Sequence, residues 1–205
     1  GTKTFQWFLV INGVLGPLLL GGAVATFFDG SNFVVDKMNL TNGMQPVISH
    51  WANASNGLDA LLDPWNLVFG LAVLFLARIL GILYIINNVN DEEIRRRGSA
   101  QLIGNSAVFL VLFLAFFFNT LLIHGYAYDQ ATGVIFTVPM KYFNNFIEMW
   151  YLAIIFVIGV VFLLYGIIRT VLSKVYIRGI WPAGIGVVLV VLALLLCTGW
   201  NNTAY

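Results

Sequence analysis

The sequence predicts an all-α integral membrane protein with about five transmembrane helices in a helical bundle. Hydrophobic residues make up 60% of the chain and charged residues only 9%, whereas a soluble domain carries about 25% charged residues. Five apolar runs recur along the chain, and each is long enough to cross the roughly 30 Å hydrocarbon core of a bilayer as one helix. A soluble helical protein would need charged faces at helical spacing, and none of these runs has one.

The five runs form a single transmembrane region over residues 1–205. The predicted spans cover residues 8–28, 65–86, 102–122, 149–171 and 180–200. A polar external loop at residues 29–63 follows the first span. Within it the segment SNGLDALLD, residues 55–63, predicts a short interfacial helix with Ser55 as its N-cap.

The first run is a span and not a leader, because it is too long for the core of a signal peptide. Its glycines and Pro17 would weaken a soluble helix but are tolerated in a membrane. The chain opens at Gly1 and stops after polar residues that directly follow the last run. We therefore expect an internal piece of a longer protein, without the first and last spans of that protein.

Basic residues predict the orientation, because short basic loops are retained in the cytoplasm. With the Gly1 end cytoplasmic, loops 87–101 and 172–179 are cytoplasmic as well. That side then holds Lys3, Arg95, Arg96, Arg97, Arg169, Lys174 and Arg178, and the other side only Lys37 and Lys141. Tryptophans near the span ends fit an aromatic belt, namely Trp51, Trp65, Trp150, Trp181 and Trp200.

No catalytic, cofactor-binding or metal-ligating residue is expected in this chain. His50 and His124 lie in predicted external segments, whereas a haem in a helical bundle is usually held by a His on an inward helix face. We favour loop or interfacial roles for both over ligand roles. Cys197 is the single cysteine, so disulfides within the chain and multi-cysteine metal sites are excluded. No basic block is long enough to follow a nucleic-acid backbone.

Two charged residues are candidate polar positions. Arg78 lies inside the second span, where a charge costs about 2.5–3.5 kcal/mol on insertion scales. We favour snorkelling towards the cytoplasmic phosphates, and the alternative is a contact with another subunit, a quinone or a lipid headgroup. Glu148 lies beside Asn144 and Asn145 at the external start of the fourth span. There it should complement the helix dipole as a first-turn carboxylate, with a proton-exit role as the alternative.

Two motifs carry a family resemblance. Residues 63–70, DPWNLVFG, look like an Asn-Pro-Phe-x-Leu-x-x-Gly start of a membrane helix. Residues 143–145, FNN, match the start of a Phe-Asn-Asn-Thr element in which Phe146 replaces the Thr. Together with the order and spacing of the spans, these motifs make the chain similar to subunit II of the cytochrome bd-type quinol oxidases of bacteria.

The resemblance implies a subunit of a terminal oxidase of the bacterial plasma membrane, which couples quinol oxidation to the reduction of O₂ to water. Haems b and d would be held by subunit I, quinol would be the substrate of the complex, and this chain would be the scaffold partner. The expected partners are subunit I in a heterodimer, membrane lipid and, as an open alternative, a small accessory subunit.

Two rival interpretations remain from the sequence. One is a secondary transporter, whose site would lie at broken helices such as one interrupted at Gly16-Pro17. The other is a plain membrane scaffold without a respiratory role.

Overall fold

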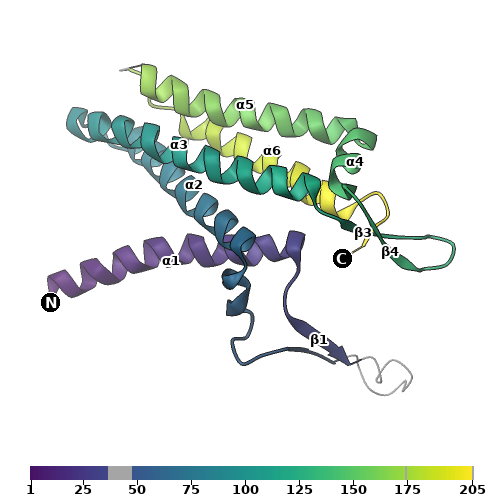
Figure 1. Ribbon diagram of the computed structural model, residues 1–205. Helices are drawn as coiled ribbons and strands as arrows, with labels where there is room; N and C mark the ends of the chain where they lie inside the picture. Colours follow the sequence, from purple (N-terminus) through teal and green to yellow (C-terminus); the bar gives the residue numbers. More distant parts are fainter. Residues whose placement is uncertain (37–47, 174, 205) are drawn as a thin grey trace.

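Five long helices dominate the computed structural model, which describes residues 1–36, 48–173 and 175–204 (Figure 1). In these ranges the long helices are α1 (Thr2–Asp29), α2 (Pro64–Asn88), α3 (Glu92–Leu122), α5 (Trp150–Leu172) and α6 (Ile180–Gly199). Each is long and apolar enough to cross a membrane. The prediction of an all-α membrane protein with five transmembrane helices is therefore confirmed.

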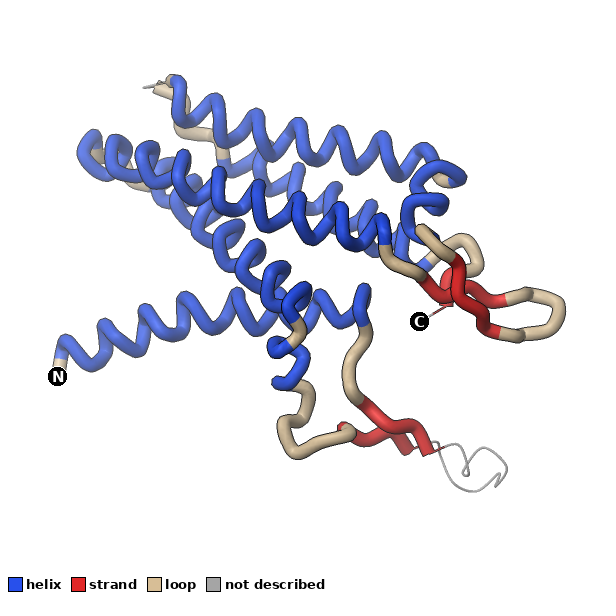
Figure 2. The backbone as a smooth tube through the Cα atoms, in the orientation of Figure 1, coloured by secondary structure: helices blue, strands red, loops and turns tan. Residues whose placement is uncertain are grey.

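The short elements lie towards one end of the helices, as does the C-terminus (Figure 2). They are β1 (Phe33–Asp36), β2 (Ile48–Trp51), η2 (Leu58–Leu62), β3 (Gly125–Tyr128), β4 (Ile135–Val138), α4 (Lys141–Glu148) and β5 (Thr203–Ala204). β1 and β2 pair antiparallel, and β3 lies between β4 and β5 in a second small sheet. The N-terminus and the turn between α2 and α3 lie at the opposite end (Figure 1). Successive long helices therefore run in alternating directions, as five spans require.

α2 begins where the sequence supplies a capping carboxylate and a proline. Asp63 Oδ1 accepts hydrogen bonds from the backbone N–H groups of Trp65 (2.8 Å) and Asn66 (3.1 Å), which have no partner within the helix. Pro64 is the first helical residue, a position whose N–H would be unpaired in any case. Asn66 is buried, and its Nδ2 donates to Ala60 O at 3.0 Å in η2. The motif therefore fixes the start of α2 against the preceding turn.

The predicted loop over residues 87–101 is much shorter in the structure, because α3 already begins at Glu92. Asp91 is its N-cap, and the carboxylate accepts a hydrogen bond from the N–H of Ile94 at 2.8 Å. Glu93 pairs with the arginines three and four residues further on, at 2.9 and 2.6 Å, a spacing that supports a helix. Hydropathy missed this extension because only the later part of α3 is apolar.

The segment between α1 and α2 contains the strands β1 and β2 and, within the short helix predicted for residues 55–63, a 3-10 helix that begins later than predicted. The N-cap of the 3-10 helix is Gly57, so Ser55 lies outside it. Ser55 Oγ donates to Asp59 Oδ1 at 2.6 Å, and Asn32 and Asn53 donate to Asp59 Oδ2 at 2.7 and 2.9 Å. These hydrogen bonds, with that of Ser55 the strongest, lower the pKa of Asp59 to about 2. The carboxylate thus ties the hairpin to the turn before α2.

The long helices pack in pairs through glycines at which two backbones meet. A Cβ added to Gly186 of α6 would lie 2.5 Å from Gly159 O and 2.5 Å from Leu163 N of α5. A Cβ added to Gly21 of α1 would lie 2.8 Å from the Cα of Gly70 in α2. Small residues allow membrane helices to approach this closely. The core is therefore built from two close helix crossings, with apolar side chains filling the space between the pairs.

Tryptophans lie at the helix ends, where the sequence places an aromatic belt. Trp65 is the second residue of α2, Trp150 the first of α5 and Trp181 the second of α6, and Trp200 follows α6. Lys37 and Lys174, which contribute to the charge count, lie outside the described residues.

Candidate functional site

A buried amide network lies where α4, α6 and the last residues of the chain meet. Asn145 of α4 is 0% exposed. Its Nδ2 donates to Cys197 O and to Thr203 Oγ1, both at 2.8 Å, and its Oδ1 accepts from Asn201 Nδ2 at 3.1 Å. One amide therefore joins α4, the end of α6 and β5. A buried polar group of this kind is favourable only when its hydrogen bonds are satisfied.

Two charged side chains of α4 extend this network. Lys141 is 9% exposed, and its Nζ donates to Asn201 O at 2.8 Å. Glu148 accepts a hydrogen bond from Asn201 Nδ2. Thr203 Oγ1 donates to Trp200 O at 2.5 Å. The segment after α6 is therefore held by side chains of α4 and also by pairing of β5 with β3.

The network includes Asn145 and Glu148 but not Asn144. Glu148 is the last residue of α4, and Met149 separates it from α5. Glu148 therefore lies just before α5 and not within its first turn, and its interaction with the dipole of that helix stays a prediction. Asn144 is exposed, and its side chain has no hydrogen-bond partner among the described residues.

Arg78 lies away from this network, on a face of α2 that the described residues leave exposed. Its side chain is exposed, within a helix that ends at Asn88. In the described part of the chain it has neither an ion pair nor a hydrogen bond. This placement does not test whether Arg78 snorkels or contacts another polar group, the two roles considered from the sequence.

Neither histidine lies in a helix. His50 pairs with Val34 in the β1–β2 hairpin, His124 follows α3, and both are exposed. Over residues 1–36, 48–173 and 175–204, no three His, Cys, Asp or Glu side chains are grouped as a metal site would require. Cys197 donates to Tyr142 O at 3.4 Å. Neither histidine is therefore placed on an inward helix face, where a haem in a helical bundle is usually held.

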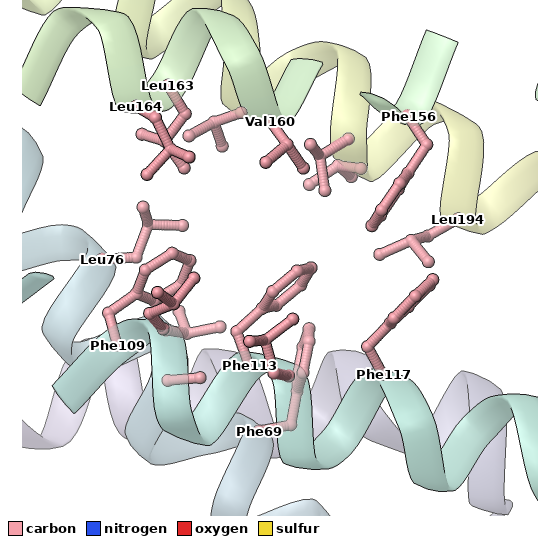
Figure 3. A pocket seen from close by; sticks show the side chains of 17 residues that line it. Phe69, Leu76, Phe109, Phe113, Phe117, Phe156, Val160, Leu163, Leu164 and Leu194 are labelled. Atoms are coloured by element: carbon pink, nitrogen blue, oxygen red, sulfur yellow. The ribbon is translucent and has the colours of Figure 1, made fainter. Parts of the chain in front are cut away.

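An apolar cavity of about 180 Å³ lies between α2 and α3 on one side and the α5–α6 pair on the other (Figure 3). Phenylalanines from both sides meet at one end of it, where the rings of Phe117 and Phe156 stack with centroids 4.6 Å apart. Sites for small molecules are usually larger, about 300–1,000 Å³, and contain a few polar groups. All of the lining side chains here are apolar. The cavity is therefore a packing gap along the contact between helix pairs.

The sequence identified Asn145 and Glu148 but missed the partners that give them a role. Asn201, Thr203 and Lys141 all belong to the network. A signal was present, since a run of polar residues directly follows the last span and Lys141 is the only basic residue between the third and fourth spans. Which segment those residues contact depends on the fold and could not be read from their spacing.

A family model described as cytochrome bd terminal oxidase subunit II matches residues 1–204. A comparison with curated proteins found no match. The match covers all five long helices, the buried amide network and both motifs that carry the resemblance in the sequence.

Proposed function

The chain belongs to the family of cytochrome bd terminal oxidase subunit II, and we propose that it is the scaffold subunit of a quinol oxidase in a bacterial plasma membrane. The family match over residues 1–204 is the observation that carries this proposal. In the proposed complex, quinol oxidation is coupled to the reduction of O₂ to water. Haems b and d belong to the partner subunit I, and this chain contributes packing surface instead of ligands.

Two features of the chain support a scaffold role. Both histidines are exposed outside the helices, and the interior between the helix pairs is lined by apolar side chains. The buried polar residues of the α4 network bind other parts of the same chain. These residues therefore stabilise the fold of this chain, as a scaffold subunit requires.

The transporter alternative has less support. A transporter site is typically built at interrupted helices near the middle of the membrane. α1 continues through Pro17 without a break, and Pro182 lies in the first turn of α6, where proline is well tolerated. The family match also favours the oxidase over the transporter.

Haem absorption of the native complex tests the proposed function. We expect membranes that lack this chain to lose the haem bands of the oxidase, because subunit I should not assemble without its scaffold. The double variant His50→Ala, His124→Ala should keep the full haem content, since both side chains are exposed outside the helices. Unchanged haem bands without the chain would contradict the scaffold role. Loss of a band in an assembled double variant would contradict the assignment of the haems to subunit I.

We also propose that the Gly1 end is cytoplasmic. Arg95, Arg96 and Arg97 start α3 at the end of the bundle where Gly1 lies, and Arg169 and Arg178 flank the connection there between α5 and α6. Retention of basic segments in the cytoplasm supports this orientation.

Labelling with a membrane-impermeant thiol reagent measures the orientation. A cysteine at Asn90, between α2 and α3, should react only after the membrane is opened. A cysteine at Ala54, in the external segment, should react in intact cells. Cys197 is 1% exposed and should remain unlabelled in both samples. The opposite pattern would reverse the proposed topology.

A further inference from the structure

α1 and α2 form an open wedge, which we define as the space between residues 2–15 of α1 and residues 78–88 of α2. The two helices touch at Gly21 and Gly70 and then separate towards the N-terminus (Figure 1). The side chains of α1 that continue the contacting face become more exposed along the helix, from 40% at Val14 to 45% at Ile11 and 68% at Trp7. On α2, Tyr84 is 62% exposed. The rest of the described chain therefore leaves the wedge unfilled.

Arg78 belongs to the stretch of α2 that borders this wedge, and its side chain is exposed. Gly81 and Ile85, three and seven residues further on, share its face of the helix. A Cβ added to Gly81 would meet no atom within 4 Å, and Ile85 is 47% exposed. A guanidinium is thus presented on an open helix face, inside a span, next to a residue with no side chain. This arrangement leaves room for another backbone beside the charge.

The geometry of α2 makes it difficult for the Arg78 guanidinium to reach water at the nearer end of the helix. Asn88 ends α2 ten residues after Arg78 (88 − 78 = 10), which corresponds to about 15 Å along the axis. In an α-helix the Cα–Cβ bond tilts towards the N-terminus, so the Arg78 side chain starts out pointing away from this nearer end. Charged residues inside membrane spans usually pair with another polar group.

We propose that a transmembrane helix carrying an Asp or Glu at the depth of Arg78 fills the wedge and pairs with the guanidinium. The charge determines the chemistry of the partner, because a planar guanidinium binds a carboxylate with two parallel hydrogen bonds. Gly81 allows the incoming helix to approach closely. The inference rests on the proposed assembly of the chain into an oxidase, in which further transmembrane helices surround it.

Photo-crosslinking in the assembled complex tests the occupant of the wedge. The photoreactive residue p-benzoylphenylalanine is placed at Gly81, where there is space for it, and at Val161 as a control. Val161 is 58% exposed on α5, away from the wedge. We expect Gly81 to yield a protein adduct whose peptide carries Asp or Glu within one helical turn of the crosslink, and Val161 to yield lipid adducts. Lipid adducts alone at Gly81 would show that lipid fills the wedge and would overturn the proposal.

Substitutions of Arg78 test the ion pair itself. Arg78→Leu and Arg78→Glu should each lower the yield of intact complex by more than about 10-fold, since removing one partner of a buried pair strands the other charge. Changing the crosslinked carboxylate to Lys in the Arg78→Glu background should restore assembly. Wild-type yields for both Arg78 variants would overturn the pair and support snorkelling. Haem absorption of the wild-type complex reports separately on the proposed oxidase function, so the two hypotheses can fail independently.

Discussion

Replacing Gly186 by leucine should separate α5 from α6 and prevent assembly of a stable complex. The new Cβ would lie 2.5 Å from Gly159 O and 2.5 Å from Leu163 N. Both are backbone atoms, so no rotamer change can relieve the clash. We expect a loss of about 3 kcal/mol or more, at or above the upper end for overpacked cores. The yield of folded complex in mild detergent and its midpoint of thermal unfolding measure the effect.

Gly184→Leu is the matched control for this prediction. Gly184 lies two residues away on the same helix, and a Cβ added there would meet no atom within 4 Å. The two variants therefore have the same change in composition and helix propensity but differ in the clash. Yield and midpoint should stay near wild type for Gly184→Leu. Equal losses in the two variants would show that the close α5–α6 crossing is not the cause.

Replacing Asn145 by leucine should release the segment after α6. The substitution conserves approximate size but leaves the carbonyl of the buried Cys197 without the hydrogen bond it accepts from the amide, and Asn201 Nδ2 keeps only its bond to Glu148. Each buried group left unpaired costs about 1–3 kcal/mol. We therefore expect a lower thermal midpoint and faster hydrogen exchange at Tyr128, whose backbone N–H donates to Asn202 O at 3.0 Å.

The neighbouring asparagine provides the control. Asn144→Leu changes an exposed side chain that has no hydrogen-bond partner in the described residues, so midpoint and exchange should remain close to wild type. The two asparagines are adjacent in the same motif, and the sequence alone does not distinguish them. If both variants behaved alike, the contribution of the amide network to stability would be refuted.

The hydropathy of the sequence was sufficient to predict the long helices, because each must bury its backbone polar groups internally in the membrane. It was less informative about their ends. α3 starts at Glu92 because Asp91 caps it and Glu93 pairs with the following arginines, and these are polar signals that a hydropathy pattern ignores. The 3-10 turn at Asp59 likewise depends on donors from separate parts of the segment between α1 and α2.

The sequence predicted some residues of the candidate site but not the residues that they contact. The FNN motif drew attention to Asn144 and Asn145, but helix geometry alone could not show which one faces the end of α6. The partners Asn201 and Thr203 are more than fifty residues away in the chain. Contacts across such distances are set by how α5 and α6 cross, and that crossing depends on glycine positions whose role is apparent only in three dimensions.

The order of the small sheet has a consequence for folding. β3 lies between β4 and β5 in the sheet. Thr203 of β5 lies opposite Ala127 of β3 and follows it in the chain by 76 residues (203 − 127 = 76). At a synthesis rate of about 5–20 residues per second, β3 should keep one unpaired edge for about 4–15 s after its own synthesis. An exposed strand edge can pair with other chains. Closure of this edge by β5, secured by the Asn145 amide, must therefore wait until both α5 and α6 have been made.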